Sequence, residues 1–237
     1  MLDTRPFDPS VIITVMPALI PFLAVTLLIG VVSIVLGSLL GGLLAWGRLG
    51  GNRLAGALSC GYVYVIRCTP AIVLLFVVFY GLPKLMAYAL GFDMDDAGRA
   101  VFAVITFSLL FGAYVSEVFR SAYLAVEEGQ YEAAVATGLS PVRAVVRIVL
   151  PQAAVVALPN FGNAVIELLK ESALAYTIGV IDLIGEAGVI ISRNFGAYGI
   201  EIYLAAMLIY WVMSIGIEKS FLLLEKRLSR NGSIRMS

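Results

Sequence analysis

Histidine is absent from this chain of 237 residues, and charged residues account for only 14% of it. The lack of histidine argues against a zinc site and against a histidine-based catalytic triad. The formal net charge is zero, so the chain has no basic field with which to attract nucleic acid. Its two cysteines, Cys60 and Cys68, lie in or beside an apolar segment and fit small hydrophobic residues better than a disulfide or a redox pair.

Long apolar stretches take up most of the chain, of which 61% is hydrophobic. Residues 10–47 contain no charge, and about 20 apolar residues are enough to cross a bilayer. A soluble domain of this size carries about 25% charged residues. We therefore predict an integral membrane protein. The first ten residues lack the basic region of a cleaved signal peptide, so the first span is expected to remain in the mature protein.

Gaps between charges predict an all-α fold with about five transmembrane helices in a single domain, residues 1–237. The expected spans are residues 19–46, 62–81, 100–119, 153–169 and 199–223. Arg67, Thr69 and Pro70 interrupt the second span, since proline cannot donate a helical hydrogen bond. The fourth ends early, at "LLKES", and a short apolar piece, residues 173–185, follows it. Short or interrupted helices hold binding groups in transport proteins, although an ordinary loop at the membrane surface also fits these residues.

Basic residues are concentrated after the first and third expected spans and at the C-terminus. Because cytoplasmic loops carry an excess of lysine and arginine, the N-terminus is expected outside and the C-terminus in the cytoplasm. The segment from residue 121 to residue 151 then forms a cytoplasmic loop.

Start and stop signals in this loop predict two short helices separated by a turn. The stretch "EEGQYEAAVATG" is rich in alanine and ends at Gly138, a residue that suits a left-handed C-cap. A second helix is expected to begin with Ser140 as its N-cap and Pro141 at its first position. Its valines form one face and Arg143 and Arg147 another, as in a helix that lies against the membrane or under a partner.

The spacing within the loop carries a resemblance to a known family. Glu132-Ala133-Ala134, three residues, Gly138, nine residues and Ile148-x-Leu150-Pro151 resemble the cytoplasmic EAA loop of permease subunits of bacterial ATP-binding-cassette (ABC) importers. "RCTPAIVLLFVVFYGLP", "GAYVSEVFRSAYLAVEEGQYEAA" and "LPQAAVVALPNFGNAVIELLKES" resemble segments of the polar amino-acid permeases, the histidine/glutamine/arginine/opine uptake group. The chain departs from this group at Cys68 and Ser121, where the family usually has glycine.

The resemblance implies the fold of an ABC type I importer permease in the bacterial cytoplasmic membrane. It implies three partners: an ATPase subunit, a periplasmic or lipid-anchored solute-binding protein, and a second permease chain that is either another copy or a paralogue. The chain has no Gly-Lys pair and hence no phosphate-binding loop, so ATP and magnesium are expected on the ATPase, with no cofactor, metal or enzyme activity here. The residues implied in coupling to the ATPase are Gln130, Glu132, Ala133, Ala134, Gly138 and Pro151.

Polar and ionisable groups within the expected spans, or in the short piece that follows the fourth, are candidates for the substrate path, because a charge in a bilayer is costly unless it is paired or hydrated. These candidates are Tyr114, Glu117, Asn160, Asn163, Lys170, Glu171 and Asp182. Such groups can receive the carboxylate and the ammonium of an amino acid. The alternative is that the charges form structural ion pairs, Glu117 with Arg120 and Lys170 with Glu167 or Glu171.

These observations favour the transmembrane subunit of an ABC importer that translocates a polar amino acid or a similar small molecule. A stand-alone secondary transporter or channel is the alternative, but it would usually show internal repeats or more than five spans, and no repeat is visible. An intramembrane enzyme would need a catalytic set, and the chain has neither histidine nor a G-x-S-x-G motif. Because five spans are too few to enclose a path, two permease chains are expected to pair.

Reporter fusions test the expected topology. A reporter fused after Arg53 or Arg230 should lie in the cytoplasm, and one fused after Gly91 should lie outside, because basic loops stay on the cytoplasmic side. Paired alkaline phosphatase and fluorescent protein fusions measure both outcomes. An active phosphatase at Arg230 would contradict the topology.

Overall fold

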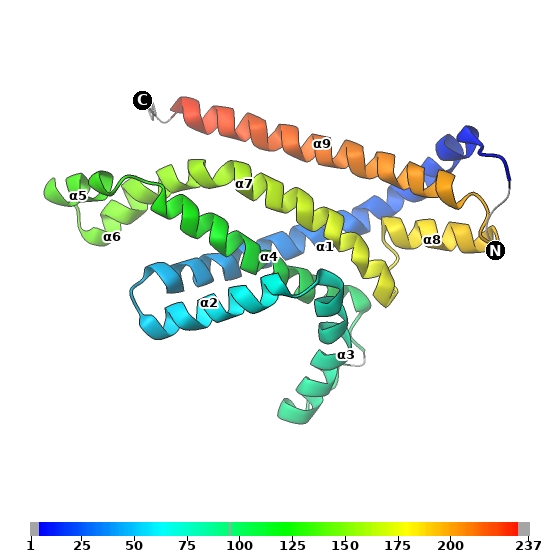
Figure 1. The fold of residues 1–237 in the computed structure, drawn as a ribbon, viewed down its shortest axis with the longest axis horizontal. Coiled ribbons are helices and arrows are strands. Elements are labelled where there is room, and N and C mark those ends of the chain that lie inside the picture. Colours follow the sequence, from blue (N-terminus) through cyan, green and yellow to red (C-terminus); the bar gives the residue numbers. More distant parts are fainter. Residues whose placement is uncertain (1–4, 95, 232–237) are drawn as a thin grey trace.

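Four long helices run side by side through the molecule: α1 (Pro9–Leu49), α4 (Arg99–Leu124), α7 (Leu150–Glu171) and α9 (Gly199–Asn231) (Figure 1). The shorter helices are α2 (Arg53–Cys68), α3 (Ala71–Leu90), α5 (Glu128–Ala136), α6 (Pro141–Ala144) and α8 (Leu183–Arg193). A π-helical turn, Val145–Val149, joins α6 to α7, and a 3₁₀-helix, Ser172–Ile178, follows α7. This computed structural model describes residues 5–94 and 96–231, and no strand occurs among them.

Five segments of the described chain are long and apolar enough to cross a membrane, which confirms the predicted all-α membrane fold. They are Pro9–Leu49, Ala71–Leu90, Arg99–Leu124, Pro141–Ile178 and Gly199–Leu228. The expected range 62–81 is instead divided between α2 and α3, because Pro70 has no N–H and Thr69 is extended (φ -97°, ψ 127°). The expected range 153–169 lies inside a longer helical segment, so the fourth span is not short.

The second helix expected in the cytoplasmic loop is continuous with α7 rather than separate from it. Pro151 stands in the first turn of α7 and cannot donate a hydrogen bond to the preceding turn. The chain widens there into the π-helical turn, in which the N–H of Leu150 donates to the carbonyl oxygen of Val145. The π-helical turn thereby allows the helix to continue past Pro151.

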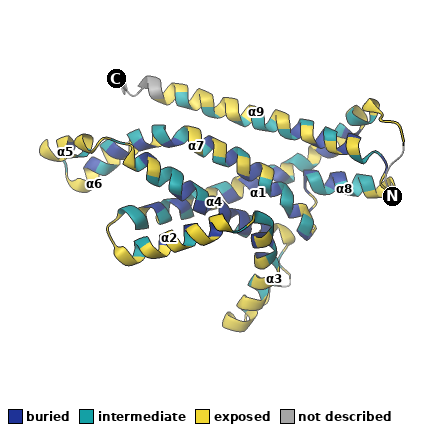
Figure 2. Ribbon diagram, in the orientation of Figure 1, coloured by how far each residue is buried: buried dark blue, intermediate teal, exposed yellow. Residues whose placement is uncertain are grey.

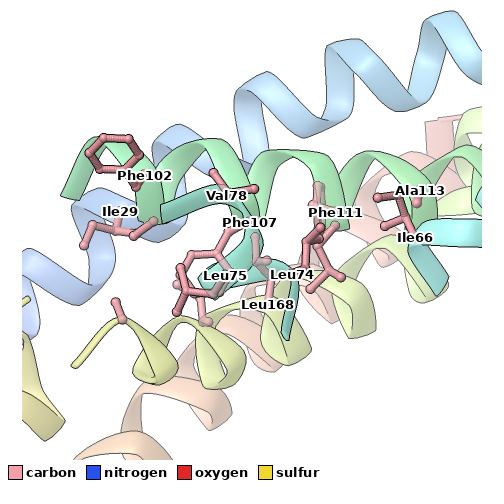
Figure 3. Close-up of a cluster of buried hydrophobic side chains, with 14 of the residues drawn as sticks. Ile29, Ile66, Leu74, Leu75, Val78, Phe102, Phe107, Phe111, Ala113 and Leu168 are labelled. Atoms are coloured by element: carbon pink, nitrogen blue, oxygen red, sulfur yellow. The ribbon is translucent and has the colours of Figure 1, made fainter. Parts of the chain in front are cut away.

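Helix α4 forms the centre of the bundle. In its most apolar stretch 61% of the residues are buried, against 28% or less in the other four membrane-length segments. Figure 3 shows Phe107 of α4 meeting Leu75 of α3 and Leu168 of α7 in one apolar cluster. The outward faces of the surrounding helices carry many exposed residues (Figure 2), including large apolar side chains that suit contact with lipid.

Glycines let α1 and α4 approach each other closely. A Cβ atom added at Gly37 would lie 2.9 Å from the carbonyl oxygen of Ser108, and one added at Gly41 would lie 3.0 Å from that of Gly112. A Cβ atom at Gly112 would in turn lie 2.8 Å from the side chain of Leu40. These positions have no room for a side chain, and small residues spaced four apart are a common means of close helix packing in membranes.

Replacing one of two adjacent glycines in α1 tests this packing. Gly41→Ala should destabilise the protein by about 1–3 kcal/mol, because the new methyl group collides with Val115 and the α4 backbone. At Gly42 an added Cβ meets nothing within 4 Å, so Gly42→Ala should leave stability unchanged or raise it by up to about 1 kcal/mol. The measurement is the thermal unfolding midpoint in one detergent, and equal midpoints for the two variants would contradict the argument.

Candidate functional site

Two helices, α2 and α7, bring charged side chains near Tyr114 of α4. The guanidinium carbon of Arg67, in the last turn of α2, lies 5.6 Å from the centroid of the Tyr114 ring. Glu167 and Glu171 of α7 lie near enough for their charges to act on this tyrosine. We refer to Arg67, Tyr114, Glu167 and Glu171 as the polar cluster. It offers a cation and two carboxylates to one ligand.

Local structure explains how each helix presents its member. Arg67 precedes the break at Thr69 and Pro70, and a cation near a helix C-terminus is favoured by the helix dipole. Glu167 and Glu171 stand four residues apart and share a face of α7. Two like charges at this spacing repel, so a cationic group that binds between them relieves the repulsion.

The chemistry of the cluster matches the two ends of an amino acid. A guanidinium can receive a carboxylate through paired N–H donors. Carboxylates can receive an ammonium or a guanidinium. Arg67 and Glu167 are exposed, whereas Glu171 is half-buried. Their charges are thus accessible at the protein surface rather than sealed in the core.

The other residues predicted for the substrate path are distributed differently. Asn163 stands one turn before Glu167 on α7, and both Asn160 and Asn163 are exposed. Lys170 is also exposed and forms neither a hydrogen bond nor an ion pair with another described residue. The structural alternative in which Lys170 pairs with a neighbouring glutamate is therefore not seen in the described part of the chain.

Glu117 belongs to an ion-pair network between α1 and α4. Its Oε2 atom accepts hydrogen bonds from Nε and Nη2 of Arg120, at 3.0 Å and 2.9 Å. Its Oε1 atom accepts from Nη1 of Arg48, which comes from the end of α1. The structure thus contains the ion pair between Glu117 and Arg120 that was the structural alternative. With Arg48 as a second partner, both carboxylate oxygens of Glu117 are bound to arginines.

Asp182 lies away from the surface and caps α8. Its side chain is fully buried, and its Oδ1 atom accepts a hydrogen bond of 2.8 Å from the N–H of Gly185. Beside it, the Thr26 hydroxyl of α1 accepts a hydrogen bond of 3.3 Å from the N–H of Leu183. Asp182 was expected on the substrate path, but these are the contacts of a helix cap that fixes α8 against α1.

Two members of the polar cluster were missing from the path predicted by sequence. Arg67 was noticed only as an interruption in an apolar region, and Glu167 only as an ion-pair partner for Lys170. The signal for Arg67 was its position in "RCTP", a charged residue directly before a helix break. Its neighbour Tyr114 is 47 residues further along the chain, and such a separation gives no pattern in the sequence.

The loop from residue 121 to residue 151 has the capped geometry that its sequence predicts. Gly138 adopts φ +94°, which confirms the expected left-handed position. Its N–H donates to the carbonyl oxygen of Val135 at 2.9 Å, and the N–H of Leu139 donates to that of Ala134 at 3.2 Å. These bonds close the C-terminus of α5. Ser140 and Pro141 stand at the start of α6 as predicted, although the Ser140 side chain makes no capping hydrogen bond.

Helix α5 keeps one side against the protein and leaves the other open. Ala134 is buried, whereas Gln130, Glu132 and Ala133 are exposed. The amide nitrogen of Gln152 in α7 lies 3.5 Å from Oε1 of Gln130, and this contact ties the two helices together. Pro151 is exposed as well. The open side thus presents small and polar residues on a fixed helix, an arrangement suited to a protein partner.

A large groove lies beside this loop and is separate from the polar cluster. Its volume is about 1170 Å³, and side chains of α1, α4, α6 and α7, among them Trp46, Val142 and Phe161, line it. None of the four cluster residues takes part in the lining. The groove is apolar and suits hydrocarbon rather than a charged solute.

Comparison with known proteins identifies the family. Residues 37–230 match the family described as "Binding-protein-dependent transport system inner membrane component". The chain belongs to this family. It is therefore the transmembrane subunit of an ABC importer, an inner-membrane component, and neither a stand-alone transporter nor a channel.

Relatives and solved structures agree with this assignment. The L-cystine transport system permease protein TcyL of Bacillus subtilis (strain 168) is 37% identical over 227 residues, 96% of this chain and 94% of that protein. The histidine/lysine/arginine/ornithine permease protein HisQ of Escherichia coli (strain K12) is 37% identical over 68% of this chain and 72% of its own. A crystal structure of an amino acid ABC transporter with histidines has a TM-score of 0.81 at 30% identity and covers 94% of this chain and 100% of that one.

The methionine ABC transporter MetNI, solved in inward-facing conformations, resembles the chain more distantly. Its TM-score is 0.66 at 19% identity, and the match covers 89% of this chain and 94% of that one. At this identity the likeness shows the fold alone.

Proposed function

We propose that this permease subunit carries a polar amino acid across the membrane along a path that passes the polar cluster. The observation that carries the proposal is the position of Arg67 over the Tyr114 ring, with the charges of Glu167 and Glu171 acting on the same tyrosine. Arg67 receives the α-carboxylate, and the two glutamates receive the α-ammonium or a cationic side chain. Relatives of the chain are named for transport of L-cystine, of histidine, lysine, arginine and ornithine, and of nopaline, which supports this substrate class.

The exposure of the cluster fits passage rather than tight binding. Exposed ion pairs contribute about 0–1 kcal/mol each, so a solute held by such contacts is released readily. Selection among amino acids then belongs to a separate solute-binding protein. Transport is driven by a separate ATPase that binds ATP and magnesium, and a second permease chain, either a copy or a paralogue, completes the path.

Helix α5 is the element proposed to contact the ATPase. One side of α5 is exposed, and hydrogen bonds fix its C-terminal end. The helix can therefore transmit the closure of the ATPase domains to the membrane helices as a rigid-body movement. The residues assigned to this contact are Gln130, Glu132, Ala133, Gly138 and Pro151, whereas Ala134, also expected there, is buried and holds α5 against the protein. Helices α5 and α6 then face the cytoplasm, and the N-terminus, at the other end of the bundle in Figure 1, faces outward.

Removing single charges tests the polar cluster. Glu171→Gln should lower the uptake of arginine by up to about fivefold, since a solvent-accessible ion pair contributes up to about 1 kcal/mol, and should lower the uptake of glutamine less. Asp182→Asn is the matched control, because asparagine retains the α8 cap and the residue lies outside the cluster. Uptake of labelled amino acids by proteoliposomes of the complete transporter, divided by the amount of protein, is the measurement. Equal uptake by the Glu171→Gln variant and the wild type would contradict the proposed path.

A pair of glycines in the coupling loop tests the role of α5. Gly138→Ala should reduce ATP-driven uptake, because the left-handed conformation at φ +94° costs an alanine about 1–2 kcal/mol and shifts the end of the helix. Gly129→Ala, within the same helix, should leave uptake unchanged, since neither position crowds an added Cβ and Gly129 has no positive φ. ATP hydrolysis and uptake are measured together, and uncoupling appears as a fall in uptake per ATP. An unchanged ratio in the Gly138→Ala variant would remove the coupling role.

A further inference from the structure

The loop between α8 and α9 presents one aromatic side chain to the surroundings. Phe195 is 98% exposed. Backbone hydrogen bonds nevertheless hold the loop in place. The N–H of Phe195 donates to the carbonyl oxygen of Ser192 at 3.1 Å, and the N–H of Gly196 donates to the carbonyl oxygen of Ile191 at 2.9 Å. The exposure of the ring is therefore a property of an ordered loop.

The N-terminal segment braces the same loop from its other side. The backbone N–H of Asp8 donates to Oε1 of Glu201, in the first turn of α9, at 3.0 Å. The guanidinium carbon of Arg5 lies 5.0 Å from the centroid of the Tyr198 ring. Contacts between segments nearly two hundred residues apart in the sequence thus fix the loop where α9 begins.

The backbone of this loop is strained at the exposed phenylalanine. Phe195 has φ +55° and Tyr198 has φ +59°, in the left-handed region that bulky residues seldom adopt. Asn194 and Gly196, residue types that tolerate this region, stand on either side of Phe195. Strain of this kind persists where the surrounding structure enforces it, and it is found mostly at functional sites. Because this backbone conformation disfavours phenylalanine, we attribute the presence of phenylalanine here to a role of its aromatic ring.

A hollow at the end of α8 includes Arg193, which stands two residues before Phe195 in the chain. The hollow has a volume of about 550 Å³, and Tyr176, Val189, Ser192 and Arg193 contribute to its lining. Arg193 is exposed and makes no ion pair with any residue in the described ranges. An exposed aromatic residue and an exposed, unpaired arginine are residue types that dominate protein–protein interfaces.

The position of the loop decides which partner can reach it. Figure 1 places the junction of α8 and α9 near the start of α1, at the end of the bundle opposite α5 and α6. If α5 faces the ATPase, this end faces the solute-binding protein.

We propose that Phe195 and Arg193 form a docking surface for the solute-binding protein. The ring inserts into an apolar pocket of that protein, and the guanidinium pairs with one of its carboxylates. The inference rests on the proposed function, in which a solute-binding protein delivers the solute to the importer. The inference assigns the contact with that protein to the loop between α8 and α9.

The test uses the complete transporter in proteoliposomes, with the loaded solute-binding protein that stimulates ATP hydrolysis by the wild-type complex. Phe195→Ala should raise the concentration of binding protein that gives half-maximal stimulation about tenfold. ATP hydrolysis without binding protein should be unchanged. Phe195→Asn, which removes the ring and suits the left-handed backbone, should have the same effect, and Arg193→Gln a smaller one. Phe92→Ala is the control: Phe92 is 61% exposed and follows α3, on the same expected side of the membrane.

Three results would overturn the inference. One is an unchanged half-maximal concentration in both Phe195 variants. Another is a rise in the Phe92→Ala variant as large as in the Phe195 variants, because any exposed phenylalanine would then serve. The third is a fall in bilayer stability or in unstimulated ATP hydrolysis with no change in the half-maximal concentration, which would assign Phe195 to lipid anchoring. If no binding protein stimulates the wild-type complex, the proposed function itself fails, and the docking surface fails with it.

Discussion

The close contact between α1 and α4 is the constraint on which the rest of the structure depends. Gly37 and Gly41 bring the backbone of α1 against α4, and Gly112 receives Leu40 from the other side. Between helices in a membrane the hydrophobic effect contributes little, so van der Waals packing decides how they associate. With α4 held in the centre, its other faces pack against α3 and α7. The same contact places Arg48 of α1 beside Glu117 of α4.

The polar cluster is a consequence of this central position of α4. Tyr114 can meet charges from α2 and α7 together because α4 contacts both helices. At one end of the bundle α4 continues toward the capped helix α5, and at the other α8 is fixed by Asp182 and by Thr26 of α1. A path for solute, a contact for an ATPase and a contact for a binding protein are thus proposed on one frame, each on a segment that the packing holds rigid.

Local signals were predictable where they act within a few residues. The left-handed turn at Gly138 follows from the glycine after an alanine-rich helix, and the break at Thr69 and Pro70 follows from the missing N–H of proline. The expected separation of the loop helix from the span at residues 153–169 was wrong, since a π-helical turn accommodates Pro151 and the helix continues into α7. A proline forbids one hydrogen bond, but whether the helix ends there depends on what the neighbouring segments pack against.

The sequence by itself determined that the chain lies in a membrane, that it has five apolar helices, and that it belongs with the importer permeases. Uncharged runs and the spacing around Glu132 and Gly138 are sufficient for this, because both are properties of contiguous residues. The tertiary structure alone decided which charges meet. Glu117 is bound to two arginines, Asp182 is buried as a cap, and Arg67 joins the glutamates of α7. Partners on different helices are chosen by the packing of glycines and large side chains between those helices, and the order of residues along the chain does not record that choice.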